Sequence, residues 1–177
     1  QTIRGKRIEP TLREATHGDF VASQIVDWQK QAQSANTLWS KLGFTKAKAK
    51  NLRVLDVGCG AGILSFALAQ RHPSIRVTAV DHAHILPYTK QIAKAMGVAS
   101  QVKTVGGDAL TYKFKAGLFD LVLFDNVTSY ISVERNVDIF HRAFNVLAAN
   151  GWIVIRAPLL DENRKGHPRG SFAGIET

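Results

Sequence analysis

The segment "LDVGCGAG", residues 55–62, decides the fold prediction because three glycines at alternate positions follow an aspartate. The apolar run Arg53–Val57 predicts a buried strand, and Ile63–Gln70 predicts a helix that stops near Pro73. Glycines between a strand and a helix let the backbone approach a ligand closely. The segment therefore predicts a loop that binds a dinucleotide, a phosphate or another nucleoside-bearing cofactor.

The spacing of the glycines favours one of these ligands. Gly58, Gly60 and Gly62 read G-x-G-x-G, whereas a dinucleotide-binding loop reads G-x-G-x-x-G and would need a glycine at Ile63. A P-loop ends in Gly-Lys-Ser/Thr, and the sequence contains no such triplet. Asp56 would repel a pyrophosphate and attract a cation. S-adenosylmethionine fits, because it carries a sulfonium and an amine but no phosphate.

The chain after this loop alternates predicted strands with predicted helices. Strands that are mostly continuous in apolar residues, with helices between them, indicate a parallel sheet covered on both faces. We predict a doubly wound α/β fold with five strands in the order 3-2-1-4-5. The further strands are expected at Arg76–Val80, Val102–Val105, Phe119–Phe124 and Trp152–Arg156, and the further helices at Ile85–Met96 and Val133–Leu147.

The chain before this loop is predicted to hold one long helix. Apolar residues from Val21 to Leu42 recur at steps of four and three, which is the spacing of one helix face. Residues 1–18 have no clear period and are expected to be irregular, and the Lys-rich stretch 45–50 reads as a connector. We therefore divide the chain into an N-terminal helical and linker segment, 1–50, and a cofactor-binding domain, 51–177.

Acidic residues follow the second and third predicted strands. Asp81 closes "VTAVD", where its two oxygens can accept from both ribose hydroxyls. Asp108 lies in "GGDAL", residues 106–110, where it can accept from the adenine amino group. Ligands of such sheets bind at the carboxyl ends of the strands. The predicted cofactor residues are Asp56, Gly58, Cys59, Gly60, Gly62, Asp81, His82, Gly107, Asp108, Ala109 and Asp125.

Together these motifs resemble the class I S-adenosylmethionine-dependent methyltransferases, over roughly residues 51–158. More narrowly, "RVLDVGCGAGILSFALAQRHPSIRVTAVD", "FDLVLFDNVTSYIS" and "LLDENRKGHPRGSFAG" resemble successive blocks of bacterial and plant small-molecule O-methyltransferases. The stretch "DFVASQIVDWQKQAQSANTLW" resembles the helix that joins that family's dimerisation domain to its catalytic domain. The resemblance implies S-adenosylmethionine as cofactor and methyl transfer to an oxygen.

The sequence departs from this family at the catalytic base. Matching Asn126 to the family's asparagine puts Ser129 and Tyr130 where the family has two histidines. Ser129 and Tyr130 are thus the catalytic candidates, although neither is a good base at pH 7. Replacement bases are open among His17, His82, His84 and His141. The acceptor pocket is expected to include Trp28, Asn126 and Tyr130, with Trp39; ordinary helix packing is the alternative for both tryptophans.

Three functions stay open. The first is O-methylation of a small molecule; the second is methylation of RNA or another nucleic acid; the third is cofactor binding without catalysis. The net charge of +9 bears on the second. Residues 1–53 carry ten Lys/Arg against four acids, so the excess marks either a solvated linker or a phosphate-binding patch. We expect no metal, because Asp125-Asn126 has no second carboxylate-amide pair beside it.

Other features bear on location and assembly. No apolar run approaches the roughly 18 residues of a membrane helix, and the lone Cys59 indicates a cytoplasmic protein. The sequence stops at Thr177, before the helix and antiparallel strands that usually follow the fifth strand in this family, and it begins without methionine. It is therefore expected to be a piece of something longer, and its open fifth strand suggests a homodimer.

Overall fold

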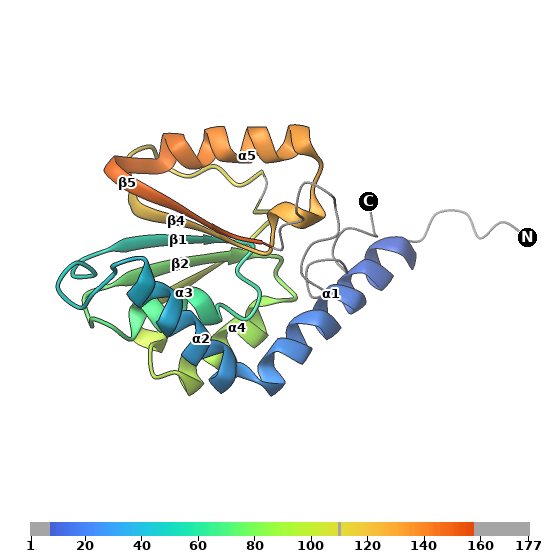
Figure 1. Ribbon diagram of the computed structural model, residues 1–177. Coiled ribbons are helices and arrows are strands. Elements are labelled where there is room, and N and C mark those ends of the chain that lie inside the picture. Colours follow the sequence, from blue (N-terminus) through green and yellow to red (C-terminus); the bar gives the residue numbers. More distant parts are fainter. Residues whose placement is uncertain (1–7, 110, 158–177) are drawn as a thin grey trace, which may run out of the picture.

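The computed structural model describes residues 8–109 and 111–157, with side chains from His17 onward except that of Tyr130. Its centre is a five-stranded parallel sheet in the order β3-β2-β1-β4-β5, which confirms the predicted order (Figure 1). The strands are β1 (Arg53–Val57), β2 (Arg76–Asp81), β3 (Val102–Gly106), β4 (Phe119–Asp125) and β5 (Leu147–Arg156).

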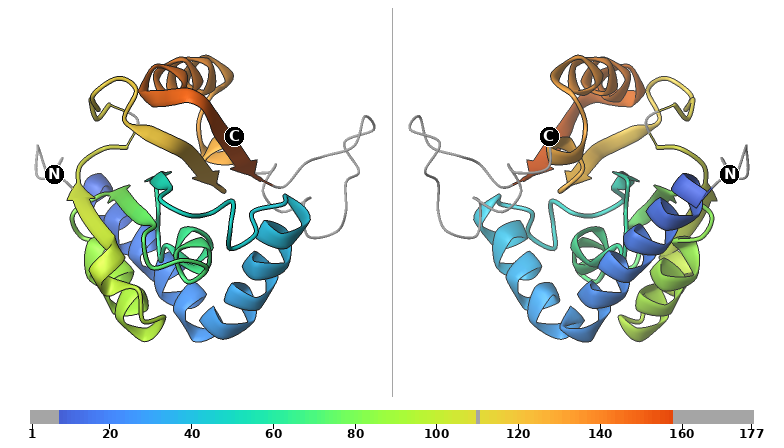
Figure 2. Two further views of the ribbon diagram at one scale, coloured as in Figure 1. Left: turned by 90° about the vertical axis from the view of Figure 1, so that its left-hand side faces the viewer. Right: turned by 90° about the vertical axis from the view of Figure 1, so that its right-hand side faces the viewer.

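Helices cover both faces of the sheet, as the doubly wound prediction requires (Figures 1 and 2). One face carries α3 (Ile63–Ala69), α4 (Leu86–Ala95) and the two helices that precede the sheet, and the other carries α5 (Val133–Val146). Each face has its own apolar core. Short 3-10 turns, η1 (Ala99–Gln101) and η2 (Thr128–Tyr130), precede β3 and follow β4.

The expectation of one long N-terminal helix is wrong. The structure has α1 (Ile8–Val26) and α2 (Trp28–Lys41), which meet at Asp27 in a V (Figure 2). Asp27 leaves the helical conformation with φ −110° and ψ 25°, and α1 begins inside the stretch expected to be irregular. The apolar spacing of three and four continues across the break, so periodicity alone could not reveal it.

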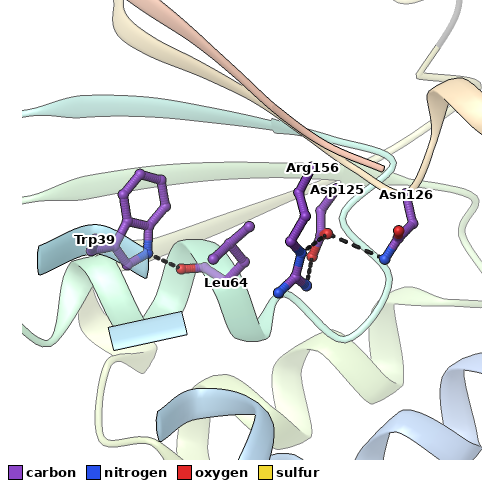
Figure 3. A network of polar contacts seen from close by, with 5 residues as sticks. All are labelled: Trp39, Leu64, Asp125, Asn126 and Arg156. Atoms are coloured by element: carbon purple, nitrogen blue, oxygen red, sulfur yellow. Dashed lines mark hydrogen bonds and ion pairs between the residues drawn. The ribbon is translucent and has the colours of Figure 1, made fainter. Parts of the chain in front are cut away.

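α2 joins the same core as the sheet. Trp39 is fully buried, and its indole N–H donates to the carbonyl of Leu64 in α3 at 2.8 Å (Figure 3). The Trp39 ring packs on Phe44, and Phe44 packs in turn on Trp152 of β5. Trp39 is therefore a core residue, and its expected place in an acceptor pocket is wrong.

β5 begins five residues before its predicted start. Leu147 pairs with Phe119, and the next printed pair is Trp152 with Leu121, so the intervening residues form an irregularity in the ladder. Asn150 takes a left-handed conformation there, with φ 61°. Asn150 and Gly151, which precede the predicted start of the strand, therefore lie within the first half of β5.

Candidate cofactor site

The glycine loop joins β1 to α3 and depends on backbone conformations that favour glycine. Gly58, Gly60 and Gly62 have φ values of 65°, 51° and 73°. A Cβ added to Gly62 would stand 2.6 Å from Cε2 of Phe66, and one on Gly58 would stand 2.7 Å from Cγ2 of Val127. The alternating glycines therefore allow a tight turn that leaves room for no side chain.

Asp56 lies beneath this loop and is almost completely buried. The Ser65 hydroxyl donates to its Oδ2 at 2.5 Å, whereas its Oδ1 has no hydrogen-bond partner within the described part of the chain. Burial raises the pKa of Asp56 to about 7; the Ser65 hydrogen bond opposes the rise, and the charges of Asp125 and Asp81 add to it. A cation near Oδ1 would favour the ionised form.

Asp81, at the end of β2, ties that strand to the glycine loop. Its Oδ2 accepts from the backbone N–H of Gly60 at 2.8 Å, and its Oδ1 accepts from that of His82 at 2.7 Å. The side chain is buried, with 3% of its surface exposed. Because each carboxylate oxygen can accept more than one hydrogen bond, Asp81 retains capacity for a ligand hydroxyl on both oxygens.

Three histidines meet beside Asp81. The ring centroids of His17, His82 and His84 lie 5.7–6.0 Å apart. Burial lowers the pKa of His17; the charge of Asp81 opposes this, and the other two histidines reinforce it. In the described chain Nε2 of His84 is buried without a partner. The sequence named these residues as replacement bases but did not predict that they form one cluster.

α1 brings His17 to this cluster by crossing the glycine loop. A Cβ on Gly60 would stand 3.4 Å from Oε1 of Gln24 and 3.7 Å from Cγ2 of Val21. His17, Val21 and Gln24 are spaced by four and three and so share one helix face. Sequence analysis missed α1 as a wall of this site, although that spacing was a usable signal.

The loop after β3 reaches the same edge of the sheet. The Gly107 N–H donates to the carbonyl of Asp81 at 3.0 Å, Asp108 follows with an exposed side chain, and Ala109 is half-buried. Cys59 is buried, and burial raises the pKa of its thiol well above its usual value. A thiol held neutral in this way is a packing group rather than a nucleophile.

The ends of β4 and β5 form an ion pair at this edge (Figure 3). The Arg156 guanidinium donates through Nε and Nη2 to the two carboxylate oxygens of Asp125, at 2.5 and 2.6 Å. Asn126, with φ 59°, donates its backbone N–H to the carbonyl of Arg156 at 2.7 Å. Sequence analysis named Arg156 only as the last residue of the predicted fifth strand and missed its contact with Asp125.

A family model described as "Methyltransferase domain" matches residues 54–151. The chain belongs to this family. The match runs from β1 to the first half of β5 and so includes the glycine loop, Asp56 and Asp81. S-adenosylmethionine is the cofactor of this class I fold. The geometry of the loop fits this cofactor, because three glycines without Cβ atoms lie next to the buried carboxylate of Asp56, whose Oδ1 has no partner in the described residues.

Known proteins resemble this chain over part of their length. The 3-hydroxy-5-methyl-1-naphthoate 3-O-methyltransferase of Streptomyces sahachiroi is 26% identical over 114 residues, which cover 64% of this chain and 33% of the relative. A ribosomal RNA small subunit methyltransferase C of Citrobacter koseri is 31% identical over 110 residues, covering 59% and 31%. The chain thus spans about a third of these relatives.

A solved structure shows the same fold. It is a proposed O-methyltransferase from Nostoc punctiforme, with a TM-score of 0.76 and 24% identity. The match covers 88% of this chain and 45% of the Nostoc protein. At this identity the likeness concerns the fold alone, but its coverage extends beyond residues 54–151.

The remaining predicted site residues lie on separate elements and not around the glycine loop. Ser129 lies in η2, half-buried; the side chain of Tyr130 and the block "LLDENRKGHPRGSFAG" lie outside the described residues. Trp28 opens α2 and packs, half-buried, on the core that contains α3. His141 is exposed on α5. Among the described residues no three His, Cys, Asp or Glu side chains are placed to hold a metal ion, and no helix is long and apolar enough to cross a membrane.

Proposed function

We propose that the chain is the cofactor-binding part of an S-adenosylmethionine-dependent methyltransferase that methylates an oxygen of a small molecule. One observation carries the proposal: Asp81, anchored on Gly60, and Asp56, with a free buried oxygen, flank one glycine loop. A ribose can donate hydrogen bonds from two hydroxyls, and a sulfonium cofactor brings positive charge. The two carboxylates match these groups separately.

Each residue then has a role in holding the cofactor, which supplies an electrophilic methyl group when bound. Asp81 accepts from the ribose hydroxyls, and Asp56 stabilises the cationic methionyl part. His82 and Asp108 lie on the adenosine side, after β2 and β3. The backbone of Gly58–Gly62 follows the ligand closely because no Cβ intervenes. Asp125 ends β4 and belongs to the predicted cofactor residues, and Asn126, which follows it, belongs to the segment where the resemblance expects the acceptor.

Nucleic-acid methylation is the second candidate, because a ribosomal RNA methyltransferase is among the relatives and the chain is basic. The position of the basic residues argues against it. The exposed Lys46, Lys48 and Lys50 precede β1, at the amino ends of the strands, whereas the glycine loop follows the carboxyl end of β1. A patch at the opposite edge would hold a nucleic acid away from the cofactor. The naphthoate relative supports a small acceptor instead.

A cytoplasmic location and a homodimer belong to this proposal as well. The lone buried Cys59 supports the first, and the exposed apolar residues of β5 support the second.

Calorimetry with S-adenosylmethionine, S-adenosylhomocysteine and NAD tests the cofactor assignment. We expect both sulfur compounds to bind and NAD not to bind. A radiolabelled methyl assay against phenols, carboxylic acids and ribosomal RNA then separates the candidates. Preferential binding of NAD would disprove the cofactor assignment. Methylation of RNA alone would mean that the acceptor is a nucleic acid and not a small molecule.

A further inference from the structure

Arg156, the last residue of β5, has no role in the proposed function. Its guanidinium is 35% exposed, and Asp125 beside it is 19% exposed. A guanidinium has five N–H donors, and the bonds from Nε and Nη2 to Asp125 use two of them. Within the described residues no other side chain accepts from Arg156. Three donors therefore have no acceptor among the side chains that the structure describes.

The backbone fixes where these donors lie. The N–H of Asn126 donates to the carbonyl of Arg156, so the last residue of β5 is tied to the residue after β4. Ser129 follows three residues later, at the position where the resembled family has its base. The backbone of Arg156 thus lies beside the segment expected to face the acceptor, and Asp125 lies between the Arg156 guanidinium and the Asn126 amide (Figure 3).

The charges at this edge divide into two sets. The carboxylates of Asp56, Asp81 and Asp125 interact electrostatically, and Arg156 is the cation that opposes them at Asp56. The carboxylates suit a cationic cofactor. A guanidinium with free donors suits an anion, and its fork matches a carboxylate best.

The chemistry of the missing base points the same way. A phenol or alcohol must lose a proton as it reacts, but the Ser129 hydroxyl is a poor base and Asp125 is already neutralised by Arg156. A carboxylic acid, with a pKa of about 4, is ionised at pH 7 and needs no base.

We propose that Arg156 binds the carboxylate of the acceptor, and that the acceptor of this site is a carboxylic acid. The inference rests on the proposed function. A carboxylate oxygen forms the new O–CH3 bond while the C–S bond breaks, and that electron pair stays on sulfur as a neutral thioether. The acid becomes a methyl ester, and no proton is transferred.

Ligand-observed NMR on protein saturated with S-adenosylhomocysteine tests this with benzoate and its neutral counterpart benzamide as probes. We expect benzoate to bind at least about tenfold more tightly than benzamide. The double variant Arg156→Met/Asp125→Asn should abolish this preference, since it removes the anchor without leaving an unpaired carboxylate. The single variant Arg156→Lys, which keeps the charge but not the fork, should reduce it.

Arg53→Met is the matched control, because Arg53 forms a similar ion pair with Asp120 at 2.8 Å but begins β1, at the opposite edge of the sheet. It should keep the preference for benzoate. Equal binding of the two probes, binding of neither, or a preference that survives in the double variant overturns the inference. S-adenosylhomocysteine binding is measured first on every variant; its absence in the unaltered chain would overturn the proposed function instead.

Discussion

The β1–β2 side of the sheet and the β4–β5 side are built differently. All seven residues of α3, which follows the glycine loop, are buried, and Asp56 and Asp81 are held by a hydroxyl and by backbone N–H groups. No residue of β5 is fully buried, and Trp152 and Ile155 are 59% and 48% exposed. The polar contact on that side is the half-exposed pair of Asp125 and Arg156.

This difference indicates a division of labour. The cofactor side is fixed by short hydrogen bonds to groups that cannot move without unfolding the core, which suits a ligand common to the whole family. The proposed acceptor side is held by one ion pair and borders β5, which ends the sheet among the described residues. Its shape can therefore be completed or altered by whatever covers β5, while the cofactor side stays unchanged.

The largest test of the comparison is Asp81→Ala. The change removes the two proposed hydrogen bonds from the ribose hydroxyls to the Asp81 carboxylate, each worth about 1.5–3 kcal/mol. It also leaves the backbone N–H of Gly60 without its acceptor. Calorimetry should show S-adenosylmethionine binding weakened at least about tenfold. Asp120→Ala, at the amino end of β4, is the control and should leave affinity unchanged. Equal affinities in both variants would remove Asp81 from the site.

A second test asks whether the glycine loop is rigid. Gly62→Ala would force a Cβ into the Phe66 ring at φ 73°, and we expect a loss of about 2–4 kcal/mol in the free energy of unfolding. Gly117→Ala has φ 65° but no atom within 4 Å, so strain alone should cost about 1 kcal/mol. Urea unfolding measures both. Similar losses would mean that the loop relaxes around the new methyl group.

Asp56 should make cofactor binding depend on pH. Its folded pKa of about 7 lies above that of a free aspartate, so the fold favours the neutral form, and a bound cation reverses this. Affinity for S-adenosylmethionine should therefore rise up to about tenfold between pH 6 and pH 8 and level off above. In Asp56→Asn the profile should be flat, with weaker binding at pH 8.

The same shift has a consequence for stability without ligand. The stabilising effect of a neutral Asp56 is present at low pH and is lost as pH rises through about 7. Asp56→Asn should thus raise the melting temperature more at pH 8 than at pH 5. A pH profile of binding that is unchanged in the variant would assign the titration to another group, such as His17, whose pKa burial lowers.

The smallest expected effect concerns the open strand. We predict that the chain self-associates weakly through the edge of β5, because unpaired strand edges attract a second chain. Ile155→Lys should reduce association a few-fold in sedimentation, whereas Val133→Lys, which alters an exposed residue of α5, should not. A clean monomer at all concentrations would show that the edge is harmless. Loss of association in Val133→Lys instead would move the contact to the helix.

The contrast between the two sides also explains what the sequence could predict. The glycine loop, Asp56 and Asp81 follow from local order: a strand, a turn and an acid at the next strand's end. Residues that lie close together in this part of the fold also lie close together in the sequence pattern, so the strand order and the glycine turn between β1 and α3 were predicted correctly. The break at Asp27 was not, because a helical period continues across it.

Contacts between distant segments were beyond local reasoning. Arg156 meets Asp125 because β5 lies beside β4, which no spacing of residues reveals. His17 reaches His82 only because α1 turns away from α2. Helical spacing also showed that Trp39 faces inward, but not whether a pocket or the core lies there.

The row of rings formed by Trp39, Phe44 and Trp152 offers an optical readout of the molecule. Trp39 is fully buried and should emit at short wavelength and resist acrylamide, whereas Trp152 is largely exposed and should emit further to the red and be quenched. In a Trp28→Phe variant, which removes the half-buried third tryptophan, quenching separates a signal from the core beneath α2 from a signal at the surface of β5. Anything that comes to lie over β5 will protect Trp152 from acrylamide first.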